Sequence, residues 1–152
     1  MTEKTTLATV MIDNGDGEVT FVREFDAPRE RVFAAYTDPD QIVKFFAPEG
    51  FSVPRESVVL EPHVGGRCEL TMVGMGMEIP INGVYLEVAA PEKLAFHVPG
   101  EPMKQEITLT DLGEGRTRLT LRQTDVPEQM RGEMAHMGFD SSWNLLENHL
   151  AS

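Results

Sequence analysis

The sequence predicts an α+β fold in which a curved antiparallel β-sheet wraps around a long C-terminal helix, with two short helices after the first strand. Three features predict it: an early strand followed by two short helical segments, a run of about six alternating strands, and one long amphipathic helix at the end. The 152 residues suit a single domain. Residues 1–17 are expected to form a loose lead-in, and residues 18–152 the domain.

The first expected elements are a strand and two short helices. Whether residues 6–12 of the lead-in add a short edge strand is an alternative that the sequence does not decide. Residues 18–26 alternate apolar with polar side chains, as a strand does. Pro28 suits the first turn of a helix, where a missing backbone N–H has no partner to lose. Residues 37–39, Thr-Asp-Pro, end this helix and begin a second, which ends at the turn-forming residues 47–50.

Residues 57–122 are typical of an antiparallel meander. Apolar and polar side chains alternate at residues 68–72, and the same alternation recurs at residues 107–110 and 119–122. Turns rich in Gly and Pro separate these runs. Short strands with this spacing predict a sheet that has one buried face and one face in water.

The last expected element is a long helix from Pro127 to about Leu150. Its apolar side chains form two neighbouring stripes, which are Phe139, Trp143, Leu146 and Leu150, and Met130, Met134, Met137, Ser141 and Leu145. Together the two stripes make an apolar face wide enough to cover a sheet, so both are expected to face it.

Charge and composition exclude several classes of partner. Lys and Arg total 13 against 25 Asp and Glu, a net charge of -12, so neither nucleic acid nor an anionic membrane is expected to bind. No apolar run approaches the ~20 residues of a membrane helix, so no membrane insertion is expected. The first residues show no signal peptide, and one cysteine excludes an intrachain disulfide, so a cytoplasmic location is expected.

No cofactor and no metal site are expected. The histidines are His63, His97, His136 and His149. None of them forms the i, i+4 pair that metal-binding helices use. Methionines gather at a hairpin tip in residues 72–77, but a soft metal ion there would lack Cys or His partners. Cys68 shares the alternation of Leu70 and is expected to be a buried, unreactive thiol.

Residues 23–39, REFDAPRERVFAAYTDP, resemble the opening signature of the SRPBCC superfamily. The likeness is greatest to its AHSA-like branch, named for the activator of heat-shock-protein-90 ATPase. Further segments resemble that branch in the same order, namely residues 45–51, 62–67, 83–88, 91–94, 117–121 and 137–146. Phe45 and Phe46 stand where the branch usually has two tryptophans, so aromatic bulk is kept while the indole donors are lost.

The resemblance implies a helix-grip fold with a cavity between the sheet and the long helix. Its members bind apolar or aromatic small molecules or lipids, act as cyclases or aromatases, or serve as co-chaperone domains. The expected function is therefore the binding of a small hydrophobic or aromatic molecule in that cavity, by a monomer or homodimer. The expected cavity lining is Phe33, Phe46, Leu70, Met72, Tyr85, Phe96, Met134, Met137 and Trp143.

Two other functions stay open. A cyclase/aromatase- or hydrolase-type enzyme would need an acid–base pair inside the cavity, for which His97 with Glu69 or Tyr85 is the candidate. A co-chaperone-like domain that regulates an ATPase would need an exposed apolar or charged patch. A sealed apolar cavity would favour the binding function. An inward-facing pair that includes His97 would favour catalysis. A filled interior with an apolar patch on the outside would favour the interaction role.

Overall fold

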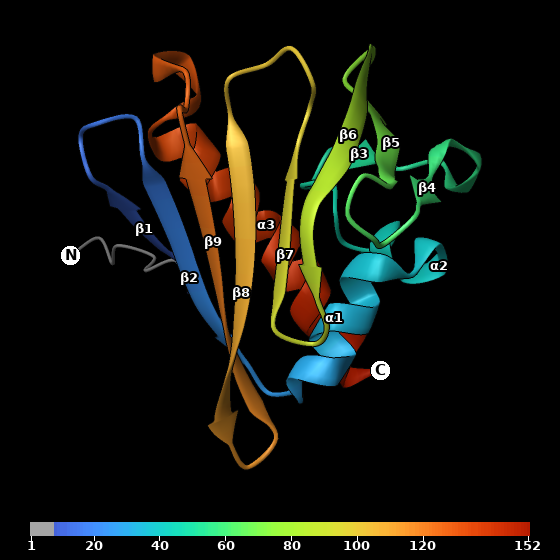
Figure 1. Ribbon diagram of the computed structural model, residues 1–152, viewed down its shortest axis with the longest axis vertical. Coiled ribbons are helices and arrows are strands. Elements are labelled where there is room, and N and C mark those ends of the chain that lie inside the picture. The colour runs from blue at the N-terminus through green and yellow to red at the C-terminus, as the bar shows by residue number, and fades with distance from the viewer. Residues whose placement is uncertain (1–7) are drawn as a thin grey trace, which may run out of the picture.

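The computed structural model describes residues 8–152 and shows a nine-stranded antiparallel sheet with the helices gathered on one of its faces (Figure 1). The strands run in the order β1-β2-β9-β8-β7-β6-β5-β3, and β4 pairs with β5. Their bounds are β1 Val10–Asp13, β2 Val19–Phe25, β3 Phe51–Ser52, β4 Val59–Leu60, β5 Arg67–Gly74, β6 Met77–Ala89, β7 Lys93–His97, β8 Lys104–Gly113 and β9 Arg116–Thr124. The helices are α1 Arg29–Thr37, α2 Pro39–Ile42 and α3 Glu133–Ala151, with the 3-10 turns η1 Arg55–Ser57 and η2 Glu128–Met130. The predicted α+β class, a curved sheet around a C-terminal helix, is confirmed.

Side chains of strand β2 pack against the long helix α3 and hold it on the sheet. Its alternation buries Val19, Phe21 and Phe25 on the inner face, as expected. The ring centroids of Phe21 and Phe139 lie 4.4 Å apart, and Phe25 stands edge-on to Trp143 at 6.2 Å. The edge-on arrangement of Phe25 and Trp143 is one that aromatic pairs prefer, and the Phe21 and Phe139 rings are in close contact, so both pairs hold α3 against β2.

Arg23 shares the inner face of β2 and is only 5% exposed. Its Nη1 lies 3.4 Å from Asp140 Oδ1 and donates to Asn144 Oδ1 at 2.8 Å. Asp140 Oδ1 also accepts the backbone N–H of Thr9 at 3.0 Å, and the ring of His136 is hydrogen-bonded to the Thr9 carbonyl. The buried guanidinium is therefore paired, and its partners join the lead-in, β2 and α3 at one point.

The lead-in carries a strand of its own. β1 pairs antiparallel with β2, with Val10 opposite Val22 and Asp13 opposite Val19. The expectation of a loose lead-in is wrong for these residues, because pairing with β2 satisfies backbone groups that would otherwise be unpaired. The edge strand that the sequence analysis did not decide is present at Val10–Asp13. Residues 1–7 lie outside the described part of the chain.

The first short helix ends where the sequence predicts, at Thr37, but the second ends at Ile42 instead of at residues 47–50, because residues 43–47 form turns rather than helix. Pro28 is extended and precedes α1, and Asp38 separates α1 from α2. The Asp38 carboxylate accepts the backbone N–H of Asp40 at 2.9 Å, so it satisfies one of the free donors at the start of α2. Pro39 occupies the first turn of α2.

Helix α3 is shorter than predicted and is rotated differently. It begins at Glu133, because Gly132 has φ +135° and separates it from η2. The stripe that contains Trp143 is buried on the sheet, but Met134 is 87% and Met137 59% exposed. The expectation that both stripes face the sheet is therefore wrong for the methionine stripe.

Polar contacts on both flanks of α3 give the physical reason for this rotation. On one flank Asn144 accepts from Arg23 of β2. On the other flank Ser142 Oγ donates to the carbonyl of Phe45 at 2.5 Å. With these two flanks fixed, the methionine stripe turns away from the sheet.

Candidate functional site

An apolar pocket lies on the inner face of the sheet, between strands β5–β7 and the segment that runs from α1 to the residues after α2. Its lining is Tyr36, Ile42, Phe46, Cys68, Leu70, Ile81, Tyr85, Leu94 and Phe96. The free volume inside it is about 20 Å³, which is room for about one water molecule. In this conformation the interior is therefore nearly filled.

The strand register explains how the sequence builds the floor of this pocket. Leu70 of β5 pairs with Ile81 of β6, and Tyr85 pairs with Phe96 of β7. Between Ile81 and Tyr85, Gly83 pairs with Cys68 and adds no side chain to the inner face. The floor is thus made of alternate residues from three adjacent strands.

Tyr85 is the pocket's most unusual residue. It is 2% exposed, and its hydroxyl, whose polar neighbour is the weakly hydrogen-bonding Cys68 thiol, makes no hydrogen bond of normal geometry among residues 8–152. Burial raises the pKa of Tyr85 above its ordinary value, and the neighbouring Cys68 adds to the shift. The phenol is therefore protonated at neutral pH and its O–H is free to donate.

Cys68 lies beside Tyr85 in the pocket. Burial raises the pKa of the Cys68 thiol to about 11, while the Tyr85 hydroxyl acts in the opposite direction. Because the thiolate is the reactive form, the side chain is a neutral thiol with little nucleophilicity at neutral pH. It adds a weak donor and no charge to the lining.

Tyr36 supplies a second phenol. Trp143 Nε1 donates to its oxygen at 2.9 Å. No acceptor for the Tyr36 proton is found within the part of the chain that the structure describes, and burial raises the pKa of Tyr36. A second neutral O–H therefore borders the pocket, held in place by the indole of α3.

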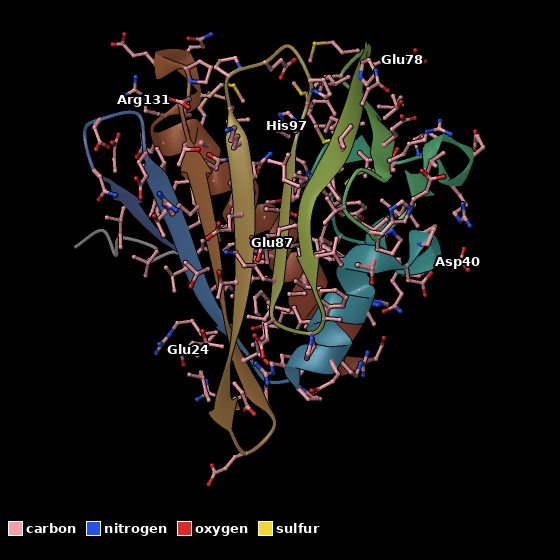
Figure 2. All side chains as sticks on the ribbon, in the orientation of Figure 1. Glu24, Asp40, Glu78, Glu87, His97 and Arg131 are labelled. Atoms are coloured by element: carbon pink, nitrogen blue, oxygen red, sulfur yellow. The ribbon has the colours of Figure 1, made fainter. Side chains whose placement is uncertain are left out.

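Among residues 8–152, no acidic, basic or histidine side chain belongs to the lining. His97 follows Phe96 in β7 and pairs with Val84 and Lys104, so the alternation puts it on the outer face (labelled in Figure 2). Glu69 also points away from the pocket and holds Arg67 at 2.9 Å. The acid–base pair considered for an enzyme, His97 with Glu69 or Tyr85, is not brought together.

Four of the nine expected lining residues line this pocket: Phe46, Leu70, Tyr85 and Phe96. Phe33 and Met72 are half-buried against the core beside it, and Trp143 is fully buried behind Tyr36. Met134 and Met137 lie on the exposed side of α3, so placing them in the lining is wrong.

The sequence reasoning missed five lining residues, which are Tyr36, Ile42, Cys68, Ile81 and Leu94. Three of them carried a usable signal. Cys68, Ile81 and Leu94 lie two or four residues from predicted lining residues of the same strands, so the alternation assigns them to the same face. Tyr36 and Ile42 carried none, because the contact of α1 and α2 with the sheet is long-range.

A second hollow, of about 210 Å³, opens on the outer face of the sheet. Its lining is Leu86, Ala95, Lys104, Gln105, Glu106, Arg122 and Thr124. Two of its charges are already paired, since Arg122 binds Glu18 at 2.8 Å and Glu106 binds Lys93 at 3.3 Å. It is a solvated groove of the polar face rather than an enclosed site.

Two further features concern metals and membranes. Within residues 8–152 no three or more His, Cys, Asp or Glu side chains are grouped as a metal site would need. Among the helices of the same residues, none has the length and apolar character to span a bilayer.

Comparison with known proteins places this geometry in context. The model of a family described as Activator of Hsp90 ATPase homolog 1-like protein matches residues 26–151. Among curated proteins, none matches the chain. A solved structure of a Rhodobacter sphaeroides protein superposes with a TM-score of 0.82 at 20% identity, over 95% of this chain and 98% of that one.

Two other solved structures are similar at higher identity. A Chromobacterium violaceum protein is 26% identical with a TM-score of 0.78, over 90% of this chain and 98% of that one. A Nitrosomonas europaea protein is 26% identical with a TM-score of 0.80, over 92% of this chain and 97% of that one. Together with the family match, these likenesses confirm the predicted helix-grip fold and its AHSA-like branch.

Proposed function

The chain belongs to the Activator of Hsp90 ATPase homolog 1-like family, and from that premise we propose that it binds a small hydrophobic or aromatic molecule in the pocket between β5–β7 and helices α1 and α2. The apolar lining supports this proposal, because ligand pockets combine apolar walls with a few polar groups that orient the ligand.

The unpartnered hydroxyl of Tyr85 carries the proposal. More than about nine in ten buried polar groups in proteins have a hydrogen-bond partner, and leaving one without a partner costs about 1–3 kcal/mol. Tyr85 is buried and its hydroxyl lacks a partner among residues 8–152. A bound molecule that reaches this hydroxyl would remove that cost, so the pocket favours occupancy.

The pocket must widen to admit such a molecule. Its free volume of about 20 Å³ is far below the ~300 Å³ of a typical ligand site. Tyr36, Phe46, Cys68, Ile81 and Phe96 are the half-buried members of the lining, so the route to solvent passes among them. Phe46 follows α2, which has only four residues. We infer that displacement of Phe46 opens the pocket.

Binding is favoured over catalysis by the chemistry of the lining. An enzyme of the cyclase or hydrolase type needs a group that takes up or gives a proton near neutral pH. The two phenols and the thiol of the pocket all have raised pKa values and stay protonated. The lining has donors and no base.

The test is an NMR titration of the methyl-labelled protein with a library of apolar aromatic fragments. Binding in the pocket would shift the methyl signals of Ile42, Leu70, Ile81 and Leu94. The methyl signals of Val10 and Ile12, which are exposed on β1, serve as internal controls. Shifts confined to the pocket methyls support the proposal. No fragment that shifts them, or equal shifts at the two control residues, would contradict it.

A second candidate function rests on the exposed apolar side of η2 and α3. This methionine face consists of Met130, Met134, Met137 and Leu145. Met side chains adapt to varied partners, and an exposed apolar patch commonly marks an interaction site. With a nearly filled interior, this patch also favours an interaction domain that regulates an ATPase, in line with the family description.

The second candidate is tested on ATP hydrolysis by the Hsp90 of the same host. If it is right, adding the chain raises the hydrolysis rate, and the double variant Met134→Glu, Met137→Glu abolishes the increase without changing the melting temperature. The variant Leu86→Glu is the control, because Leu86 is exposed on the outer face of the sheet. An unchanged hydrolysis rate with the wild-type chain would rule this function out for that ATPase.

A further inference from the structure

The polar groups of the pocket are all neutral donors. They are the hydroxyl of Tyr85, the hydroxyl of Tyr36 and the thiol of Cys68. The Tyr85 hydroxyl has no partner among residues 8–152, and the Tyr36 oxygen already accepts from Trp143, so each hydroxyl offers its proton. A site built in this way complements an acceptor atom.

The lining offers nothing that would neutralise a charged ligand. No Lys, Arg or His side chain belongs to it, and no Asp or Glu either. A carboxylate or an ammonium group would lose its hydration on entering and would find no opposite charge. The occupant that fits is therefore uncharged.

The walls also set the shape of the occupant. Four of the lining side chains carry an aromatic ring, namely Tyr36, Phe46, Tyr85 and Phe96. Rings pack best against flat apolar surfaces, in offset or edge-on geometry. Tyr85 and Phe96 are opposite each other on adjacent strands, so the free hydroxyl lies beside an aromatic wall.

We propose that the ligand is an uncharged, flat molecule with a carbonyl-type oxygen, an inference that rests on the proposed function. The Tyr85 hydroxyl is the specificity-determining donor to that oxygen. Tyr36, held by Trp143, is the second donor that borders the same space. A hydroxyl that otherwise lacks a partner gains one when a carbonyl binds, and gains none from a hydrocarbon.

The test uses three probes that share one bicyclic skeleton: indanone, indane and indane carboxylate. Their dissociation constants are measured by the pocket methyl shifts for the wild type and for Tyr85→Phe. Indanone is expected to bind the wild type more tightly than indane, and Tyr85→Phe is expected to weaken indanone about tenfold. The same variant leaves indane unchanged, and indane carboxylate binds weakest to both proteins.

Thr117→Val is the matched control for removal of a buried hydroxyl. Thr117 lies on the inner face of β9 outside the pocket, and its hydroxyl donates to the Ala27 carbonyl at 2.7 Å. This variant is expected to lower the melting temperature and to leave the preference for indanone over indane intact. Tyr85→Phe is expected to melt no lower than the wild type, because the hydroxyl it removes has no partner in the described part of the chain.

The outcomes separate this inference from the function on which it rests. Equal affinity of the wild type for indanone and indane, or tightest binding of the carboxylate, overturns the inference and leaves a binding pocket in place. A preference for indanone that survives in Tyr85→Phe overturns the role of Tyr85. If none of the three probes shifts a pocket methyl of the wild type at saturation, the proposed function and the inference both fail. The comparison of probes on the wild type needs no variant to fold.

Discussion

Trp143 of α3 donates a 2.9 Å hydrogen bond to the hydroxyl oxygen of Tyr36 of α1, and this bond joins the two helices at the edge of the pocket. The indole is fully buried and stands edge-on to Phe25 of β2. One side chain therefore links the sheet, the long helix and a wall of the candidate site.

Trp143→Phe is expected to lower the free energy of unfolding by about 2–4 kcal/mol, because it leaves a cavity and removes the donor to Tyr36. Urea denaturation measures the change. Tyr36→Phe isolates the hydrogen bond, because it keeps the ring and removes only the acceptor, and is expected to cost about 1–2 kcal/mol. A decrease of less than about 0.5 kcal/mol in the free energy of unfolding for Trp143→Phe would show that the Trp143–Tyr36 contact does not stabilise the fold.

Asp140→Ala is expected to destabilise the fold by about 3–5 kcal/mol, because it leaves the buried Arg23 guanidinium without its buried carboxylate and frees the Thr9 N–H. The matched control is Glu24→Ala. Glu24 pairs with Arg116 and Arg118 at the surface at 3.3 Å, and its loss is expected to cost less than about 1 kcal/mol. Equal effects of the two variants in urea denaturation would contradict a special role for the buried pair.

Cys68 provides a pH-dependent prediction. Burial raises the pKa of its thiol to about 11, whereas an unfolded thiol titrates near ~8.5. Iodoacetamide is therefore expected to alkylate the folded chain slowly at pH 8 and the urea-unfolded chain rapidly. Equal rates in the two states at that pH would show that the thiol is not protected.

The same pKa shift predicts how stability depends on pH. Because the folded state holds the Cys68 proton to higher pH, its contribution to stability is complete below ~8.5 and is lost as the pH rises toward about 11. The free energy of unfolding of the wild type should therefore fall more steeply over this window than that of Cys68→Val. Parallel curves for the two proteins would contradict the shift.

Gly83→Ala is expected to destabilise the sheet by about 2 kcal/mol or more, because a Cβ at Gly83 would lie 2.8 Å from the Cys68 carbonyl oxygen and 3.4 Å from that of His97. Gly138 of α3 is the control glycine, since a Cβ there meets nothing within 4 Å. Gly138→Ala is expected to stabilise the protein by about 0.5–1 kcal/mol through helix propensity. Melting temperatures that shift in the same direction for both would contradict the steric argument.

Much of the fold could be predicted because it depends on local periodicity. The alternation of β5, β6 and β7 placed Leu70, Tyr85 and Phe96 on the face that bears the pocket. The rotation of α3 could not be predicted in this way. It depends on Arg23 and on the Phe45 carbonyl, which lie about a hundred residues away in the chain. The helix sequence alone shows two mainly apolar stripes and does not say which of them faces the sheet.

The lack of a hydrogen-bond partner for the Tyr85 hydroxyl among residues 8–152 could not be predicted either. Whether a buried hydroxyl has a partner depends on the few ångströms around it, which are set by Cys68 of the adjacent strand and by residues of α1 and α2. An alternation pattern assigns a side chain to a face of the sheet but says nothing about its neighbours above that face.

The small free volume of the pocket has a kinetic consequence. Any occupant larger than a water molecule binds only to a conformation in which the rings around the pocket have moved apart. The apparent affinity is then the intrinsic affinity reduced by the fraction of molecules that are open, so an open fraction of about one in a hundred weakens it about a hundredfold. Once the rings close again, departure waits for the next opening. If the chain binds a small molecule as proposed, the pocket therefore suits long retention of that molecule rather than rapid exchange.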